Sequence, residues 1–472
     1  MHSSFNTELI KQRLLNSESL ICDEQHTLFY SDCEPLFTKS TRDTSLDILL
    51  LDNRLPMVLQ LIHYLLDQRS FLALNGTSEG AHLKENFTTF CNKIISFDGK
   101  IKWSNINSGI KIFDNPFFRS RKAIFHEDKS YLVLKTSGST NRPKFVLHDQ
   151  SHVLRNALGS ASKLTLSPED RVLIPVPVYH SYGLTTALIP SIIAGCSVKL
   201  VSNTNIIRLI EAIKSFKPTV MFATPSLIEM LLKMRTKITI PKVTTTAGDR
   251  LREDLFLEYE QRIGTLLNLY GSTEMGAMAV SDVSQPLIDR AKSGVSALPG
   301  VELKVQNTKD QSGAIYCKNE NRFIEYLDYD GVSIHSPDNI HNWFDTKDYG
   351  QLNGTEIKVL GRSDHKINRN GILLSYFEIE NAIALACKEL KKVVVVKQQS
   401  AQDIMGAQFA IICQPKKDDT IIDHELIRRK CVENLSKSMI PDAIQLVDEM
   451  PQLANGKIDR RSLQKKFDHL IG

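Results

Sequence analysis

The chain has 472 residues, of which 42% are hydrophobic and 24% are charged, close to the composition of an ordinary globular protein. This composition excludes a wholly disordered chain and a collagen-like repeat, and the length suggests roughly two to four domains. The formal net charge is +4 with the two signs interspersed. This does not favour a nucleic-acid partner, because dedicated nucleic-acid binders show a basic stripe, but a small anionic substrate is compatible with it.

The cysteines and the apolar segments indicate a cytoplasmic protein. Eight cysteines lie far apart and no Cys-x-x-Cys pair occurs, so we expect reduced, mostly buried thiols. The N-terminal segment lacks the apolar core of a signal peptide. Residues 46–66 are apolar, but Asp47, Asp52, Arg54 and His63 interrupt them. We therefore expect a strand and a helix there and no membrane span.

From about residue 46 to residue 270, short β-rich runs alternate with amphipathic helical runs. This alternation predicts an α/β fold with parallel-rich sheets covered by helices. The predicted strands are 46–51, 71–74, 131–135, 171–176, 197–202, 219–223, 242–246 and 265–269. The predicted helices include one opened by Pro56 and the segments 206–216 and 226–234.

After about Gly294 the pattern changes to short strands and turns, which predicts a β-rich subdomain. Its predicted strands are 301–305, 314–317, 331–335 and 355–360. The polar, glycine-punctuated segment 361–371 is a natural boundary. Beyond it we predict a small α+β domain with helices 376–387 and 425–436 and strands 393–397 and 408–414. The expected domains are a large N-terminal body, 1–363, and a C-terminal domain, 364–472.

The segment LKTSGSTNRPKFVLHD (134–149) has the composition of a loop that binds a phosphate chain. Small residues let backbone N–H groups approach phosphate oxygens, hydroxyl groups donate further hydrogen bonds, and a lysine supplies positive charge. The spacing is not that of a Walker loop, and an isolated stretch of this kind is more often a solvated loop. The candidate phosphate-binding residues are Thr136, Ser137, Gly138, Ser139, Thr140 and Lys144.

Six further segments follow in order: PVYHSYGL (177–184), TTTAGDRL (244–251), NLYGSTEMG (268–276), WFDTKDYG (343–350), GRSDHKINRNG (361–371) and PQLANGKIDRRSL (451–463). Together with the phosphate loop, this series resembles the adenylate-forming superfamily, which includes acyl- and aryl-CoA synthetases, firefly luciferase and the adenylation domains of peptide synthetases. The resemblance covers about the last three quarters of the chain. Asn141, Phe145 and Lys347 stand where the family usually has glycine.

The resemblance implies a nucleotide site assembled from several of these segments. It implies that Tyr270 stacks on adenine, Thr273 contacts the α-phosphate region and Glu274 holds Mg²⁺. An aromatic face suits a purine, and a hard cation prefers carboxylate and phosphate oxygens. Asp348 is implied to bind the ribose, and Arg362 the ribose or a phosphate. The resemblance also places at ATP or AMP the residues Ala247, Gly248, Asp249, Asn268, Gly271 and Ser272.

The segment PVYHSYGL is implied to line the pocket for the acid, with His180 contributing to catalysis as well. Amino-acid-activating members often carry an Asp near this segment, and none is present here. This favours a substrate without an α-amino group, such as a fatty or aromatic carboxylate. The expected pocket residues are His180, Ser181, Tyr182, Gly183, Thr224 and Gly271.

The C-terminal motifs imply a mobile domain that carries a catalytic lysine. By resemblance, Lys457 is the adenylation lysine, Asp364 the hinge and Gly371 part of the channel for the thiol. A lysine and Mg²⁺ aimed at the α-phosphate would stabilise the negative charge that develops there.

The implied activity is ATP-dependent activation of a carboxylic acid to acyl-AMP with release of pyrophosphate, followed by acyl transfer to a thiol. The implied cofactors are ATP and Mg²⁺, and the acceptor is CoA or the phosphopantetheine of an acyl or aryl carrier protein. The residues alone do not separate these acceptors. One alternative is a non-catalytic nucleotide-binding or scaffold protein that retains the fold. Another is luciferase-like oxygenation, for which no distinguishing residue is found.

Overall fold

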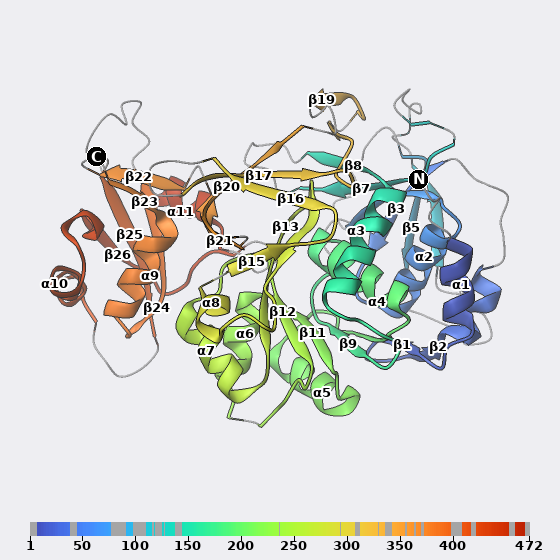
Figure 1. The fold of residues 1–472 in the computed structure, drawn as a ribbon, viewed down its shortest axis with the longest axis horizontal. Coiled ribbons are helices and arrows are strands. Elements are labelled where there is room, and N and C mark those ends of the chain that lie inside the picture. The colour runs from blue at the N-terminus through green and yellow to red at the C-terminus, as the bar shows by residue number, and fades with distance from the viewer. Residues whose placement is uncertain are drawn as a thin grey trace. The chain divides into compact units, whose positions relative to one another are not determined.

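The computed structural model describes residues 7–37, 45–76, 91–97, 110–115, 118, 125–126, 128–136, 144–235, 237–292, 294–306, 312–328, 330–335, 342–354, 356–362, 365–369, 372–397, 408–416, 422–452 and 458–467 (Figure 1). The chain forms two compact units. The first unit comprises Met1–Leu303 with Cys317–Phe344, and the second Lys304–Tyr316 with Asp345–Gly472. The expected boundary between residues 363 and 364 falls outside the described residues and stays a prediction.

One sheet of the first unit is built mainly from the first half of the chain. Its strand order is β19-β18-β8-β7-β4-β3-β5-β6, and β3 pairs in parallel with β4 and β5, as does β4 with β7. The strands are β3 (Leu46–Leu51), β4 (Ser70–Asn75), β5 (Lys93–Phe97), β6 (Ile110–Asp114), β7 (Tyr131–Lys135), β8 (Phe145–Asp149), β18 (Glu325–Leu327) and β19 (Ser333–His335). The predicted strands 46–51 and 131–135 are confirmed at their bounds, whereas β19 begins two residues later than predicted.

The second sheet of this unit continues in the order β15-β14-β13-β12-β11-β9-β10-β1-β2. From β13 to β1 the neighbours run parallel. The strands are β1 (Leu20–Cys22), β2 (Thr27–Phe29), β9 (Arg171–Ile174), β10 (Ser197–Leu200), β11 (Val220–Ala223), β12 (Val243–Thr246), β13 (Leu266–Ser272), β14 (Gly276–Val280) and β15 (Gly294–Ala297). The prediction of parallel-rich sheets is confirmed, although β9 and β10 end two residues earlier than predicted and β13 extends to residue 272.

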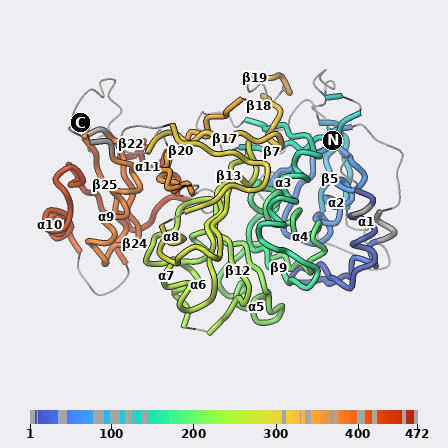
Figure 2. Tube along the Cα trace, in the orientation of Figure 1, coloured from blue at the N-terminus to red at the C-terminus, as the bar shows by residue number. Residues whose placement is uncertain are grey.

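Helices lie on both sides of this sheet. Helix α3 contacts β8 of one sheet and β14 of the other, while α5, α6 and α7 contact β9, β11 and β13 (Figure 2). The helices are α1 (Thr7–Leu15), η1 (Tyr30–Phe37), α2 (Leu55–Leu66), α3 (Gln150–Lys163), η4 (Tyr182–Leu188), α4 (Ile189–Ala194), α5 (Ile206–Phe216), α6 (Pro225–Leu232), α7 (Glu253–Arg262) and α8 (Leu287–Ala291). The helix 206–216 is confirmed, and α6 is shifted slightly from 226–234. Across the part of the chain that the structure describes, no helix combines the length and hydropathy that a membrane crossing needs.

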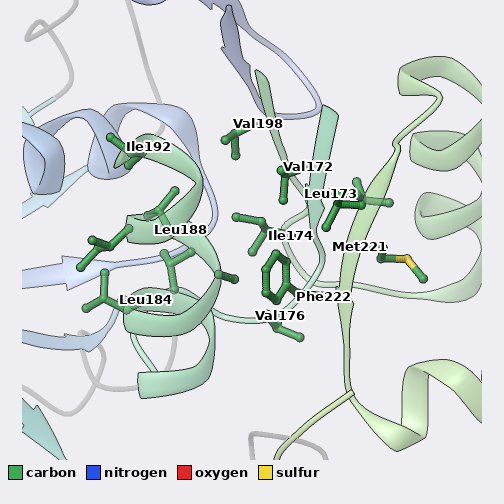
Figure 3. Close-up of a cluster of buried hydrophobic side chains, with 14 of the residues drawn as sticks. Val172, Leu173, Ile174, Val176, Leu184, Leu188, Ile192, Val198, Met221 and Phe222 are labelled. Carbon is green, nitrogen blue, oxygen red and sulfur yellow. The ribbon is translucent and has the colours of Figure 1, made fainter. Parts of the chain in front are cut away.

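The core around β9 explains why its sequence reads as a continuous apolar run. Figure 3 shows Val172 and Ile174 pointing toward the helical segment that carries Leu184 and Leu188, whereas Leu173 points to the opposite face. Alternate residues of a strand face opposite sides of a sheet. Both faces of β9 are therefore covered, as is usual for parallel strands.

The Asp47 carboxylate inside β3 has hydrogen-bond donors around it. Asp47 is fully buried. Its carboxylate accepts hydrogen bonds from the Tyr64 hydroxyl group at 2.7 Å, the Arg69 guanidinium group at 3.3 Å and the backbone N–H of Lys93 at 3.2 Å. Burial of a carboxylate is tolerated when hydrogen bonds and a cation compensate for lost water. The interrupted apolar segment is thus a strand and a helix, as predicted.

The second unit contains a three-stranded sheet with helices packed on it. β24 and β25 are antiparallel, β25 and β26 are parallel, and α9 contacts β24. Two strands, β16 (Val301–Val305) and β17 (Ser312–Asn319), cross the boundary between the units. The remaining elements are β20 (Phe344–Asn353), β21 (Glu356–Arg362), β22 (Lys366–Arg369), β23 (Ile372–Ser375), α9 (Tyr376–Ala386), β24 (Leu390–Lys397), β25 (Phe409–Pro415), α10 (His424–Asn434), η5 (Lys437–Met439), β26 (Ala443–Leu446) and α11 (Arg460–Phe467). The α+β prediction for this region is confirmed within two or three residues at most element ends.

All eight cysteines are buried and carry free thiols. Burial raises the pKa of the Cys33 and Cys196 thiols to about 12 and that of Cys22 to about 11. Thiols of this kind are poor nucleophiles near neutral pH. The prediction of reduced, buried cysteines is confirmed.

Candidate active site

Three neighbouring parallel strands of the first unit end at one edge of the sheet. Ala223 of β11 pairs with Thr246 of β12, which in turn pairs with Asn268 of β13. Ligands of open α/β sheets bind outside the carboxyl ends of the strands. The structure therefore brings together, at one such edge, the pocket candidate Thr224 after β11 and residues predicted from two separate motifs: the segment 247–249 after β12, and Tyr270 to Glu274 at the end of β13.

The turn between β13 and β14 presents Thr273 and Glu274. The two strands pair antiparallel with an irregularity at Tyr270 and Gly271. A Cβ on Gly271 would lie 2.6 Å from the Gly276 carbonyl oxygen, and Gly276 itself adopts a left-handed φ of 69°. Glycine accommodates both conditions without strain. The two glycines of the motif are thus explained by the backbone of this turn.

This turn is fixed from the adjoining β8, α3 and the segment before β18. The ring Nε2 of His148 is 2.8 Å from the Thr273 carbonyl oxygen, and the N–H of Phe323 donates to the Glu274 carbonyl oxygen at 2.8 Å. Asn156 bonds both backbone groups of Ala277, at 3.0 and 2.8 Å. Burial lowers the pKa of His148 to about 4, so near neutral pH the ring is uncharged and carries its proton on Nε2.

The carboxylate of Glu274 and the ammonium group of Lys144 meet on Tyr326. The Tyr326 hydroxyl group donates a hydrogen bond to Glu274 Oε1 at 2.9 Å. The Lys144 Nζ lies 5.1 Å from the centroid of the Tyr326 ring, within the range of a cation–π contact. Two residues predicted from motifs 130 positions apart therefore share a tyrosine that neither motif contains.

The phosphate-loop segment connects β7 and β8. The backbone N–H of Thr136 donates to the Lys144 carbonyl oxygen at 2.9 Å, and its hydroxyl group does so at 3.3 Å, which closes the two ends of the loop. Phe145 opens β8 and is fully buried in the core on one face of the sheet. Its ring is thus a core residue. The other predicted members of the loop lie outside the described residues: Ser137, Gly138, Ser139 and Thr140.

The segment that contains His180 leaves β9 and enters the π-helical turn η4. The His180 carbonyl oxygen accepts from Leu184 N–H at 2.9 Å, and the His180 ring lies 4.4 Å from that of Tyr179. A Cβ on Gly183 would fall 2.1 Å from the Pro177 carbonyl oxygen, so only glycine fits. Single π-helical turns are frequent at functional sites because they redirect side chains. His180 is half-buried.

Tyr182 reaches from η4 to the ends of β11 and β12. Its hydroxyl group lies 3.2 Å from the Ala223 carbonyl oxygen and 3.0 Å from both the carbonyl and the hydroxyl oxygen of Thr245. Burial raises the pKa of Tyr182. The neighbouring Ser181 hydroxyl group contacts that of Thr185 at 3.2 Å. The ring of Tyr182 therefore has a fixed position beside the strand ends.

Several other predicted site residues have clear local roles in the fold. Thr224 caps α6 by accepting from the Leu227 N–H, and Asn268 donates from its side chain to the Arg290 carbonyl oxygen at 2.5 Å. Asp249 is exposed and accepts from the N–H of the next residue. Ala247 is buried, and Gly248 adopts a left-handed φ of 93°. Their assignment to nucleotide or acid binding stays a prediction.

In the second unit, Asp348 and Arg362 lie opposite each other on β20 and β21. The Arg362 guanidinium group is 3.5 Å from Asp348 Oδ1 and donates to the Thr346 carbonyl oxygen at 3.3 Å. Lys347 adopts a left-handed φ of 61°, and its side chain pairs with Asp345 at 2.7 Å. This backbone geometry explains why glycine suits the position. The structure thus brings together Asp348, predicted for the ribose, and Arg362, predicted for the ribose or a phosphate. The predicted Asp364, Gly371 and Lys457 lie outside the described residues.

The residues that support the turn were missed in the sequence. His148, Asn156 and Tyr326 contact it from β8, α3 and β18. One weak signal for His148 was present in the sequence, since a histidine that follows the apolar residues of a strand needs a hydrogen-bond partner. Tyr326 gave no signal, because its strand has only three residues.

Comparison with known proteins gives consistent results along the chain. A family model described as AMP-binding enzyme matches residues 31–327. The 2-succinylbenzoate–CoA ligase of Listeria innocua is 26% identical over 341 residues, which cover 71% of this chain and 70% of that protein.

Solved structures share the fold over nearly the whole chain. One is the ATP-bound MatB of Rhodopseudomonas palustris, with a TM-score of 0.80 and 17% identity; the match covers 99% of this chain and 100% of that one. Another is the o-succinylbenzoate CoA synthetase of Bacillus subtilis in complex with its acyl-adenylate intermediate, with a TM-score of 0.75 and 20% identity; the match covers 98% of both chains. The expected fold is confirmed. Because the family model spans well over half of the 472 residues, the chain belongs to the AMP-binding enzyme family.

Proposed function

We propose that the protein is an acid–thiol ligase that activates a carboxylic acid with ATP. In the first step a carboxylate oxygen attacks the α-phosphorus of ATP, the bond to the β-phosphate breaks and pyrophosphate leaves. In the second step a thiolate attacks the acyl carbon and AMP leaves. The acid is proposed to be an aryl or fatty acid, since no carboxylate in the segment 177–184 is available to pair with an α-amino group.

One observation carries this proposal. In a member of the AMP-binding enzyme family, the carboxylate of Glu274 and the ammonium group of Lys144 converge on Tyr326 at the ends of β13 and β8. An anchored carboxylate and a lysine at this spacing suit a nucleotide triphosphate, because one binds the metal that accompanies it and the other binds its phosphates.

The donor set at Glu274 fits Mg²⁺. Within the described ranges no group of three or more His, Cys, Asp or Glu side chains gathers as a metal site. Mg²⁺ at nucleotides is held by one or two carboxylates together with phosphates and water, so a single carboxylate suffices. Glu274 would supply that oxygen, with the Thr273 hydroxyl group beside it. Bound Mg²⁺ would neutralise charge on the phosphates.

The chain's own residues would divide the remaining tasks. The half-buried ring of Tyr270 offers a face for adenine at the end of β13. Asp348 would accept hydrogen bonds from the ribose hydroxyl groups, oriented by Thr346, whose hydroxyl oxygen accepts the Asp348 N–H at 3.2 Å. Lys457 would stabilise the charge that develops at the α-phosphate, and the C-terminal domain would turn at Asp364 between the two steps.

CoA is the acceptor that the comparisons favour, because the relative from Listeria innocua is named as a CoA ligase. A carrier-protein phosphopantetheine is the alternative thiol. The two are separated by supplying each of them to enzyme that already holds acyl-AMP and measuring the thioester formed.

The proposal is tested by acid-dependent exchange between ATP and labelled pyrophosphate over a panel of aryl and fatty acids. We expect exchange with at least one acid, and we expect Lys457→Ala to abolish it while sparing acyl transfer from preformed acyl-AMP. Lys465→Ala, at an exposed position of α11, is the matched control and should leave both activities unchanged. Silence of the wild-type protein across the panel would favour the non-catalytic, nucleotide-binding alternative.

A further inference from the structure

Tyr326 is brought to the active site by a long-range strand pairing. It lies at the centre of β18, which runs antiparallel to β8, and it pairs with Val146, two residues after Lys144. The first residue of β8 follows Lys144 directly, so this register fixes the tyrosine next to the end of the phosphate loop.

The hydroxyl group and the ring of Tyr326 contact different residues. Its hydroxyl group donates to Glu274 Oε1 at 2.9 Å, and its ring face lies 5.1 Å from Lys144 Nζ. The ring of Phe323 packs against it with centroids 4.7 Å apart, and the backbone N–H of Phe323 holds the Glu274 carbonyl oxygen at 2.8 Å. The same short segment thus holds Glu274 by both its backbone and its carboxylate.

The arrangement keeps two opposite charges apart. Among the residues that the structure describes, no cation lies within ion-pair distance of the Glu274 carboxylate, and no carboxylate lies within that distance of Lys144. Both side chains are half-buried, where attraction between opposite charges is stronger than in water. Without the tyrosine between them, the flexible lysine would be drawn onto the carboxylate, and both groups would be lost to a ligand.

We propose that Tyr326 is a positioning residue that separates Glu274 from Lys144 and thereby reserves the carboxylate for the metal and the ammonium group for the phosphates. This inference rests on the proposed function. The hydroxyl group fixes one oxygen of Glu274 and leaves the other for the metal, as partners of metal ligands commonly do. The ring supplies a weaker, displaceable partner for Lys144, which the phosphates of ATP can replace.

The hydroxyl group and the ring are tested separately with Tyr326→Phe and Tyr326→Leu. Binding of Mn²⁺, used as the probe, is measured by electron paramagnetic resonance in the presence of ATP and without acid, so that no reaction occurs. Binding of ATP alone is measured by calorimetry in excess EDTA.

Loss of the hydroxyl group should weaken Mn²⁺ binding in the ATP complex about tenfold, since hydrogen bonds to charged groups contribute roughly that much. Tyr326→Phe should bind metal-free ATP as the wild type does, because the phenylalanine ring can still contact the Lys144 ammonium group. Tyr326→Leu should weaken both Mn²⁺ and metal-free ATP, because Lys144 then closes onto Glu274. The Mg²⁺ concentration that half-saturates pyrophosphate exchange should rise in both variants.

The chain offers a closely matched control in Tyr316. Its hydroxyl group donates to Gln306 at 2.9 Å, and Lys304 Nζ lies 5.6 Å from the centroid of its ring. Tyr316, in the second unit, therefore makes the same two kinds of contact as Tyr326. Tyr316→Phe should leave Mn²⁺ and ATP affinities unchanged.

The outcomes of these experiments separate a failure of the Tyr326 inference from a failure of the proposed ligase function. If the wild type catalyses exchange and Tyr326→Phe binds Mn²⁺ as tightly as the wild type, Tyr326 is only structural and the inference is overturned. A fall in melting temperature with unchanged metal affinity leads to the same conclusion. If the wild type shows neither exchange nor Mn²⁺–ATP binding, the proposed function fails, and the inference fails with it.

Discussion

His148 makes the active-site turn sensitive to acid, because it is a fully buried histidine that must stay uncharged. Its Nε2 lies 2.8 Å from the Thr273 carbonyl oxygen, so the neutral ring serves as a donor there. Burial lowers its pKa from 6.5 to about 4, and the nearby His152 contributes in the same direction. Between these two values the unfolded chain binds a proton that the folded chain excludes. Stability from this group is therefore complete above about pH 6.5 and is lost as the pH falls toward 4.

The magnitude follows from the width of that interval. One pKa unit corresponds to about 1.4 kcal/mol, so a depression of roughly 2.5 units amounts to about 3 kcal/mol at full effect. His148→Gln removes the titrating group and keeps an N–H that can donate to the Thr273 carbonyl oxygen. We expect the variant to be less stable than, or equal to, the wild type at pH 7.5 and to gain about 3 kcal/mol relative to it by pH 4.

The assay is urea unfolding followed by circular dichroism at a series of pH values from 4 to 7.5, with the difference in unfolding free energy plotted against pH. Taking the difference cancels the contributions of the carboxylates and of the other histidines to the pH dependence, because both proteins share these groups. His424→Gln, at an exposed position of α10, is the control and should give a flat difference. A flat difference for His148→Gln as well would refute the argument that the folded chain excludes a proton at this site.

Three further changes test other features of the structure. The two N–H groups of the Asn53 side chain are shared among three carbonyl oxygens, and its amide oxygen accepts from the Val178 N–H. Asn53→Ala should lower the free energy of unfolding in urea by about 3 kcal/mol, and a loss below about 1 kcal/mol would contradict this network. Lys347→Gly should raise stability by about 1 kcal/mol because φ is 61° there, which calorimetry would show as a higher melting temperature. Tyr182→Ala should shift pyrophosphate exchange toward bulkier acids, and an unchanged preference would exclude the ring from the acid pocket.

The sequence predicted best the elements whose apolar pattern is complete within the element itself. β3 and β7 were predicted at their observed bounds because both faces of their sheet are covered, so that all their residues except Asp47 and Lys135 are hydrophobic. α5 was predicted because its apolar residues recur at helical spacing and Asn205 caps it. These signals are local, so no knowledge of the partner strand or helix was needed.

Short elements defined by a distant partner were not predicted. β1 has three residues and exists through its parallel pairing with β10, more than 170 positions away. It extends the second sheet and gives the N-terminal segment a structural role. β18 is equally short and depends on β8. A three-residue segment has no periodicity that could reveal it.

The same distinction applies to the candidate site. Glu274, Lys144 and Asp348 were found because each belongs to a contiguous motif that resembles one of the adenylate-forming superfamily. His148 and Tyr326 contact the turn from 125 and 52 positions away, and only the pairing of the folded strands brings them there. Motifs therefore indicate which groups react, whereas the residues that hold those groups at their spacing require the structure.

The departures from the family pattern bear on the choice between an enzyme and a non-catalytic protein. Phe145 is fully buried in the core on one face of its sheet, and Lys347 adopts a left-handed φ of 61°, so both departures affect the stability of the fold. Neither places a group between Glu274 and Lys144. Tyr326 contacts Glu274 through its hydroxyl group and Lys144 through its ring, an arrangement that we propose leaves both charged groups available to a ligand. Such an arrangement suits a ligand that carries both a metal and phosphates, which supports the ligase over the non-catalytic alternative.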